Sequence, residues 1–270
     1  MKLLIRKKNM KIGNLTYAVR SVIGNRDEQQ DCVGILAEGD SLLAVVCDGM
    51  GGLEGGALAS STSVSTLIEI FKKRDTTEKV SELYCYSVDV LDERISSFVD
   101  ENGYRLNAGS TIVSVFVENG NLNWMSVGDS RLYLLRGDDI VQATRDHNYF
   151  LKLDDMRQTI GEEFKPTDSE LAKGNALISF IGMGGIEIMD ISMNPIALLP
   201  GDSILITSDG LFKVLSDMSI KEIIKTNENI ESAADSLLEM TEKLSPDDRD
   251  NISFVLIRAE SEKENCDETN

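Results

Sequence analysis

Four aspartates lie where apolar segments begin or end, and their positions are the most informative chemical feature of the sequence. Asp48 follows LLAVVC, Asp129 follows WMSVG, Asp209 follows SILITS, and Asp250 precedes NISFVLI. If these segments are strands whose ends meet at one edge, the carboxylates converge, and their mutual repulsion then requires cations. Oxygen ligands with no histidine or cysteine nearby favour Mg²⁺ or Mn²⁺ over zinc or copper. The pattern therefore indicates a divalent metal site.

Phosphoryl chemistry is the reaction that such a site suits best. Two ions held by aspartates can lower the pKa of a bridging water and set it for in-line attack at phosphorus. An arginine is the expected partner, because its planar fork matches phosphate oxygens. Arg26, in the polar turn GNRDEQQD, is the candidate. Its alternative role is that of a surface arginine paired with Asp27 or Glu28.

Each aspartate also has a plain structural alternative. Asp-Gly, present at 48–49 and 209–210, is an ordinary hairpin turn signal, and Gly-Asp-Ser at 128–130 is compatible with a simple turn. Asp202, in LPGDS, precedes its strand after a proline turn, so we expect a loop residue there. The metal interpretation of Asp48 and Asp209 depends on their shared context of a long apolar run, an aspartate, a glycine and then a helix or loop.

The spacing of apolar residues predicts the strands and helices that must position these aspartates. Period-two alternation predicts strands over residues 16–22, 40–48, 110–118, 122–129, 131–137, 202–209 and 251–259. Apolar stripes predict helices over 57–71 and 78–99, and further helices are expected over 217–226 and 231–244. Short turns carrying ENGN, GDSR and RGDD predict antiparallel hairpins. We therefore expect an α+β body in which two antiparallel sheets pack face to face with helices outside.

Composition favours one domain. The chain has 270 residues and 41% apolar content, enough for one generous core. We expect a basic lead over residues 1–12, a single domain over 13–258 and an acidic, disordered tail over 259–270. Within the domain, residues 147–177 are polar and weakly periodic, which predicts an irregular, flap-like surface segment near the site.

Charge and hydropathy exclude several classes of protein. A net charge of −19 and a pI near 4.4 argue against nucleic acid as a partner. No apolar window approaches the roughly 18 residues of a membrane helix, so no membrane association is expected. The start, MKLLIRKKNMK, lacks a signal-peptide core, which favours a cytoplasmic protein. The four cysteines show no CxxC pairing, so neither a disulfide framework nor a thiolate zinc site is indicated.

Taken in order, the motifs resemble those of a known family. GNRDEQQD, VCDGMGG, AGSTIVSV, VGDSRLYLL, ATRDH, ITSDGLF and RDNISFVLI are similar to the signatures of the metal-dependent protein phosphatases, the type 2C Ser/Thr phosphatases of the PPM family. The resemblance runs from about Leu15 to Ile257. The methionine in DGMGG and the compact length resemble the bacterial branch.

The resemblance implies a four-layer αββα sandwich with a binuclear Mn²⁺ or Mg²⁺ centre that removes phosphate from phosphoserine and phosphothreonine in proteins. By the same resemblance, Asp48 bridges both ions and the carbonyl of Gly49 completes the coordination of one. Asp209 and Asp250 hold the other ion. Phosphoproteins are then the partners, together with an opposing Ser/Thr kinase, and the protein is expected to be a monomer.

Further roles are implied around this centre. Asp31 supports the site through metal-bound water, and Arg26 binds the substrate phosphate. Gln30 replaces a glutamate of many relatives and can still accept a hydrogen bond from such a water. Asp129 matches a third, weaker metal site of some members. Because Lys213 stands where the family often has an acid, we expect two ions, with Asp129 as a supporting or turn residue.

Two more positions depart from the family pattern. Met50 stands where eukaryotic relatives have a histidine regarded as the general acid, and methionine cannot donate a proton. His147, in TRDH, is expected to be structural.

Three functional interpretations remain open from the sequence. The favoured one is an active metal-dependent protein phosphatase. The second is a phosphatase-like binding or scaffold protein with weak or lost chemistry. The third is a metal-dependent hydrolase of small phosphate esters.

Overall fold

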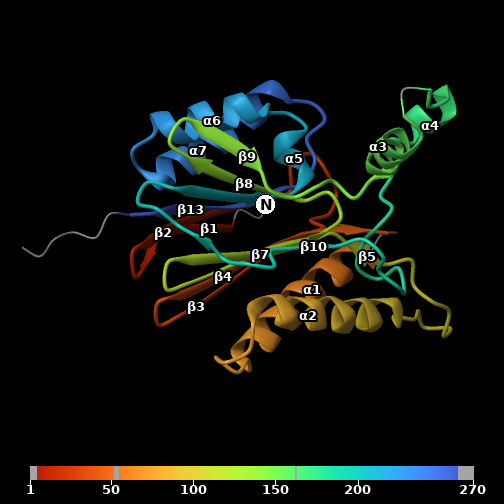
Figure 1. The fold of residues 1–270 in the computed structure, drawn as a ribbon, viewed down its shortest axis with the longest axis horizontal. Helices are drawn as coiled ribbons and strands as arrows, with labels where there is room; N and C mark the ends of the chain where they lie inside the picture. Colours follow the sequence, from red (N-terminus) through yellow and green to blue (C-terminus); the bar gives the residue numbers. More distant parts are fainter. Residues whose placement is uncertain (1–4, 52–54, 162, 261–270) are drawn as a thin grey trace, which may run out of the picture.

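Two antiparallel sheets pack face to face, with helices α6 (Asp217–Thr226) and α7 (Ile230–Leu244) outside one sheet and α1 (Gly55–Lys72) and α2 (Val80–Ser96) outside the other (Figure 1). The computed structural model describes residues 5–51, 55–161 and 163–260, with the side chains of residues 5–9 left out. The layers confirm the α+β sandwich predicted from the sequence. The sandwich brings strands that are distant in sequence to the same edge.

The first sheet has the strand order β1-β2-β13-β12-β8-β9. Its strands are β1 (Ile5–Ile12), β2 (Leu15–Val22), β8 (Arg131–Arg136), β9 (Asp139–Gln142), β12 (Ser203–Thr207) and β13 (Ile252–Ala259). The second sheet has the order β10-β7-β6-β4-β3, with β11 paired to β7 and β5 paired to β4. Its strands are β3 (Asp31–Glu38), β4 (Ser41–Met50), β5 (Gly109–Ser110), β6 (Ile112–Glu118), β7 (Asn121–Val127), β10 (Asp190–Ile191) and β11 (Ile196–Ala197).

The sandwich follows from strands that are apolar on both faces. In β4, Leu42, Ala44 and Val46 pack in the core between the sheets, whereas Leu43 and Val45 pack against the helices. Both sets are fully buried. Burial of each of these leucine and valine side chains contributes about 1.5–3 kcal/mol, so β4 is a main source of stability as well as the strand that carries Asp48.

Helices α1, α2, α6 and α7 cover the outer faces, and α6 and α7 begin at side-chain caps. The bounds are α1 (Gly55–Lys72), α2 (Val80–Ser96), α3 (Tyr149–Ile160), α4 (Asp168–Ala172), α5 (Asp209–Phe212), α6 (Asp217–Thr226) and α7 (Ile230–Leu244). Ser216 caps α6 by accepting a hydrogen bond from the Ser219 amide at 3.2 Å, and Asn229 caps α7 through the Glu231 amide at 2.8 Å. The α6 and α7 ranges agree closely with the predicted 217–226 and 231–244.

Several local predictions were wrong. The segment 147–177 is not irregular, because it contains α3 and α4, which project from the sandwich (Figure 1). Most of the basic lead forms β1, which pairs with β2. The last strand runs through Ala259, the first residue of the expected tail, and residues 261–270 lie outside the described part of the chain. The GDSR turn is not a hairpin, since it joins β7 of one sheet to β8 of the other.

In the described ranges, no helix is long and apolar enough to cross a membrane.

Candidate metal centre and active site

Asp31 and Asp48 are brought together by the second sheet. They are direct partners in the antiparallel pair β3–β4, so their side chains leave the same face. Two residues further along, Val33 and Val46 occupy the same face and pack in the core between the sheets. Because side chains alternate along a strand, both carboxylates are directed into the space between the sheets, at its edge.

The first sheet delivers two more carboxylates to that edge. Asp209 follows the end of β12, and Asp250 lies two residues before β13. These strands are antiparallel neighbours, so the end of one lies beside the start of the other. The Ser208 amide donates to the Ser253 carbonyl at 2.9 Å, which extends the pairing to the aspartates. A link to the other sheet comes from the Ser208 hydroxyl, which donates to Asp31 Oδ2 at 2.7 Å.

One cavity of about 750 Å³ gathers the predicted site residues. Its walls include seven of them, namely Arg26, Gln30, Asp48, Gly49, Asp129, Asp209 and Asp250. Asp31 lies beneath, with 6% of its surface exposed. Among the described residues, the cavity walls contain six acidic residues, the aspartates at 27, 48, 129, 209 and 250 and Glu28, but only two basic ones, Arg26 and Lys213. The cavity therefore carries a large excess of negative charge.

Burial and this excess of negative charge raise the pKa values of the carboxyl groups of Asp31, Asp48 and Asp129. Burial first, and the charge of Asp31 second, raise the pKa of Asp48 well above its usual range. The pKa of Asp31 is raised to about 7, mainly by burial and further by the charges of Asp209 and Asp250, although hydrogen bonds from serine hydroxyls lower it. Burial and the charge of Asp209 raise the pKa of Asp129 to about 6. These carboxylates are poorly neutralised by the protein alone.

The two cations of the cavity are each paired with one carboxylate. Arg26 Nη2 donates to Asp250 Oδ2 at 2.8 Å, so Arg26 does not form the pair with Asp27 or Glu28 considered as its alternative. Lys213 Nζ forms an ion pair with Asp209 Oδ2. Among the described residues, no three His, Cys, Asp or Glu side chains are arranged closely enough to hold one ion together. Two of the expected ligands are instead oriented toward cations of the chain itself.

The donor set nonetheless suits a hard divalent cation. Asp31 Oδ1 is buried and has no hydrogen-bond partner in the described part of the chain, which is costly unless a cation or an ordered water satisfies it. The cavity offers carboxylate and carbonyl oxygens from Asp48, Gly49, Asp209 and Asp250, which are the ligands of Mg²⁺ and Mn²⁺. Both observations fit the metal that the sequence indicated.

Glycines let the backbone approach this centre. A Cβ on Gly49 would come within 2.1 Å of the Gly56 carbonyl oxygen and 2.7 Å of the Gln30 carbonyl oxygen, so no other residue fits there without backbone movement. Residues 52–54 lie outside the described part of the chain, and α1 begins at Gly55. Gly49 thus allows α1 to start against the end of β4.

Sequence reasoning missed two residues that hold the site in place. The Asp48 amide donates to Thr111 Oγ1 at 3.0 Å, and Thr111 shares a hydrogen bond with Ser130 at 2.7 Å. Asn251 accepts from the Gln30 amide at 2.7 Å and donates to the carbonyls of Ile23 and Glu28. The adjacent Asp250 was noticed for its charge, whereas the neutral side chains at 111 and 251 gave no such signal.

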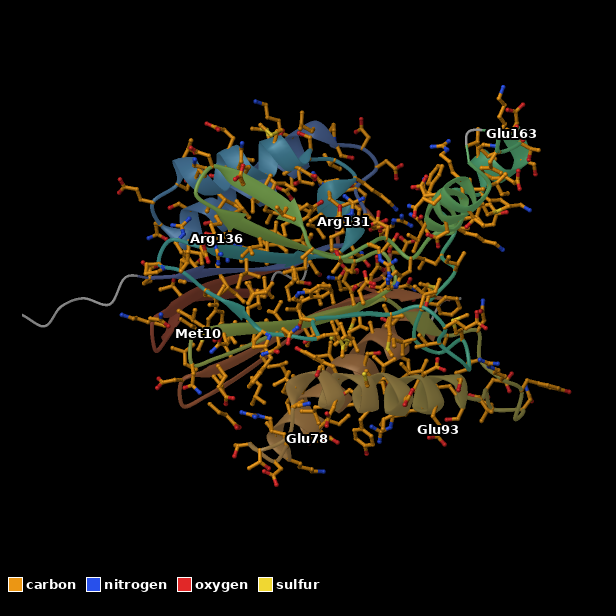
Figure 2. The ribbon with its side chains drawn as sticks, viewed as in Figure 1. Met10, Glu78, Glu93, Arg131, Arg136 and Glu163 are labelled. Atoms are coloured by element: carbon orange, nitrogen blue, oxygen red, sulfur yellow. The ribbon has the colours of Figure 1, made fainter. Side chains whose placement is uncertain are left out.

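The turn that carries Asp129 is fixed by the TRDH segment. Arg131 binds Asp146 through two hydrogen bonds of 2.9 and 2.6 Å, and its guanidinium lies 3.8 Å from the centre of the Phe212 ring. Figure 2 shows Arg131 beside α5, at the end of β8 opposite to Arg136. His147 Nδ1 accepts from the Gly128 amide at 3.1 Å, and the ring is fully buried. These contacts give His147 the structural role predicted for it.

Part of the cavity wall is apolar. Met50, Leu177 and Phe180 line it beside the carboxylates. A Cβ on Gly109 would lie 2.7 Å from the Phe180 ring, so this ring packs directly on the backbone of β5. Leu177 lies in the segment that follows α4. The segment that contains the projecting helices α3 and α4 therefore contributes to the wall of the site.

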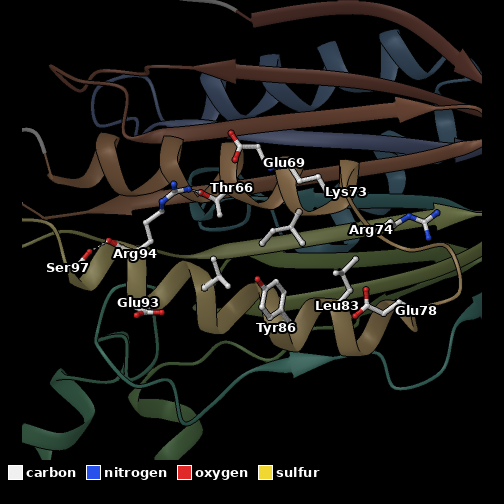
Figure 3. Close-up of a pocket in the computed structure, with 12 residues that line it drawn as sticks. Thr66, Glu69, Lys73, Arg74, Glu78, Leu83, Tyr86, Glu93, Arg94 and Ser97 are labelled. Carbon is white, nitrogen blue, oxygen red and sulfur yellow. Dashed lines mark hydrogen bonds between the residues drawn. The ribbon is translucent and has the colours of Figure 1, made fainter.

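A second cavity, of about 730 Å³, lies between α1 and α2 and offers a comparison (Figure 3). Its acids Glu69, Glu78 and Glu93 are matched in number by the bases Lys73, Arg74 and Arg94. Arg94 also donates to Thr66 Oγ1 at 2.7 Å. Charges of opposite sign balance here, so this cavity lacks the unneutralised carboxylates of the first one.

Comparisons with known proteins agree with this geometry. The family model "Protein phosphatase 2C" matches residues 21–154. "Serine/threonine phosphatase stp" of Listeria innocua is 27% identical over 236 residues, which cover 86% of this chain and 90% of that protein. The S. agalactiae serine/threonine phosphatase has the same fold, with a TM-score of 0.79 at 24% identity over 91% of this chain and all of that chain.

A further solved structure is the catalytic domain of the serine threonine protein phosphatase PstP in complex with two manganese ions. It is 25% identical, with a TM-score of 0.73 over 92% of this chain and 99% of that chain. The matched segment contains the motifs around Arg26, Asp48 and Asp129, while the fold extends the similarity to Asp209 and Asp250. The chain therefore belongs to the protein phosphatase 2C family.

Proposed function

We propose that this chain hydrolyses phosphoserine and phosphothreonine in proteins, using two Mn²⁺ or Mg²⁺ ions. The observation that carries the proposal is the convergence of Asp48 from one sheet with Asp209 and Asp250 from the other on one strongly acidic cavity. The manganese ions in the related PstP support the choice of cofactor, and the names of the relatives support the substrate class.

Five residues of the chain would hold or support the metal ions. From one sheet, Asp48 and the Gly49 carbonyl would hold the ions, with Asp48 contributing to both. From the other sheet, Asp209 and Asp250 would be ligands, and Asp31 Oδ1, which is buried and unpartnered among the described residues, would support the site. When bound, such ions lower the pKa of a water and stabilise charge on the phosphoryl oxygens.

The substrate phosphate is bound by Arg26. Its side chain is 56% exposed and lies in the cavity wall, so its guanidinium is free to leave Asp250 for phosphate once that carboxylate has another cation. Two parallel hydrogen bonds from an arginine fit the oxygens of a phosphate. Met50 offers no proton to the leaving hydroxyl, so that proton comes from solvent.

Phosphate release from a phosphothreonine peptide tests the proposal. The peptide is incubated with the protein in Mn²⁺, in Mg²⁺ and in chelator, with a small phosphate ester at equal concentration as the comparison substrate. We expect release that requires the metal and is faster from the peptide. Release from the ester alone would support a small-molecule hydrolase, and Mn²⁺ binding without any release would support a binding or scaffold protein.

Three expectations about the protein in the cell stay predictions. They are an opposing Ser/Thr kinase, a cytoplasmic location and a monomeric state.

A further inference from the structure

Lys213 is held next to Asp209 by one turn of helix. Asp209 is the first residue of α5 and Lys213 is the residue that caps its end. The Lys213 amide donates to the Asp209 carbonyl at 3.0 Å, and the Lys213 ammonium pairs with the Asp209 carboxylate. Because the two residues are four positions apart on one helical turn, the pair depends on local structure only.

The ammonium also lies in the field of the other carboxylates. Burial lowers the pKa of Lys213, but the hydrogen bond to Asp209 and the charges of Asp129 and Asp250 outweigh it and raise the pKa above its usual value. The Lys213 side chain is 55% exposed, whereas that of Asp209 is 12% exposed. The lysine can therefore leave the carboxylate by a side-chain rotation toward solvent, while the carboxylate stays in place.

We propose that Lys213 is an internal cation that competes with a divalent metal ion for Asp209 and thereby lowers the metal affinity of the centre. The proposal rests on the metal centre of the proposed function. An ion that takes Asp209 Oδ2 as a ligand must first displace the ammonium from the same oxygen. After displacement the lysine remains tethered nearby, where its positive charge repels the ion. Both effects weaken metal binding.

The arrangement at Asp250 supports this interpretation. Arg26 pairs with Asp250 as Lys213 pairs with Asp209, so two expected ligands of the same ion are each engaged by a cation of the chain. The ion must break both pairs on binding. Arg26 has a further role in binding phosphate, so Lys213 is the residue at which competition can be measured without removing a substrate contact that we have assigned.

Calorimetric titration with Mn²⁺ tests the proposal on the full-length protein. Lys213→Met removes the charge and keeps most of the unbranched side chain, and we expect at least one Mn²⁺ ion to bind about tenfold more tightly than to the wild type. Lys225→Met is the matched control, because Lys225 also pairs with an aspartate, Asp138, but lines a different cavity. It changes the net charge equally and should leave Mn²⁺ affinity within about twofold.

An unchanged or weaker Mn²⁺ affinity in Lys213→Met would overturn the proposal, as would an equal gain in Lys225→Met. Lys213→Gln is a second variant that also removes the charge, and it should show the same gain in Mn²⁺ affinity. Circular dichroism in chelator checks that both variants are folded. If the wild type binds no detectable Mn²⁺, measurable Mn²⁺ binding by Lys213→Met supports the proposal. If neither protein binds Mn²⁺, the proposal is overturned. Titration needs no substrate, so wild-type protein that binds Mn²⁺ without dephosphorylating the peptide contradicts the proposed function alone.

Discussion

Asp31 and Asp48 stand directly opposite each other across β3 and β4, with both carboxylates directed between the sheets. The Gly49 amide donates to the Gln30 carbonyl at 3.1 Å, so the neighbouring pair 31/48 is of the non-hydrogen-bonded kind, in which side chains lie closest. Like charges at such a pair are destabilising, and burial adds to the effect. The fold therefore carries an electrostatic strain that a bound divalent cation relieves.

Asp48→Asn should stabilise the metal-free protein and abolish its response to metal. Removing one of two facing carboxylates relieves repulsion, which we expect to raise the free energy of unfolding in chelator by about 1 kcal/mol. The wild type should gain stability from Mn²⁺, while the variant should gain little because the residue that we propose as a ligand of both ions is gone. Thermal unfolding of both proteins in chelator and in Mn²⁺ measures the two effects. A variant that is less stable than the wild type in chelator would contradict the electrostatic argument.

Asp209→Asn should remove nearly all turnover and leave the fold intact. We expect kcat for a phosphothreonine peptide to fall by at least about 100-fold, because a proposed metal ligand is lost from the centre. Asp202→Asn is the matched comparison, since Asp202 lies just before the same strand at its other end and pairs with Arg136. That change should lower the melting temperature and leave the Mn²⁺ dependence of turnover as it was. A folded, active Asp209→Asn protein with unaltered metal dependence would count against the assignment.

Asp190→Asn should destabilise the protein at neutral pH but not at acid pH. Burial raises the pKa of Asp190, but the nearby His147 ring, with Nε2 3.5 Å from Asp190 Oδ2, and hydrogen bonds from Arg145 outweigh it and hold the pKa well below its usual range. A carboxyl with a lowered pKa in the folded state stabilises above its ordinary pKa of about 4, and this contribution is lost as the pH falls below that value. Urea unfolding of both proteins should show a difference of about 2 kcal/mol at pH 7 that shrinks toward pH 3. A difference independent of pH would mean that packing, not charge, accounts for it.

The sequence predicted the convergence of the acids well because the signal is local to each strand. Asp48, Asp209 and Asp250 each adjoin an apolar run, and antiparallel pairing then places strand ends beside strand starts at one edge. The helices α6 and α7 were equally readable, since their apolar stripes and caps are also local. These features could be predicted because each depends on residues that are close together in the sequence or on adjacent strands.

The cation pairs were not predicted, for two different reasons. Arg26 and Asp250 are 224 residues apart, and only the finished fold brings them together. Lys213 and Asp209 are four residues apart, but the short helix α5 was not recognised, so the spacing was not interpreted as a helical pair. The helices of residues 147–177 were missed because their surfaces are mostly exposed, with Leu153 the one buried residue of α3, and so carry little apolar periodicity.

The most direct test of the metal centre is an anomalous diffraction map of crystals grown or soaked in Mn²⁺. We predict two peaks about 3.5–4 Å apart, the spacing of two-metal hydrolytic sites, bounded by the carboxylates of Asp48, Asp209 and Asp250. No peak in this cavity, or manganese bound only elsewhere on the acidic surface, would contradict the account.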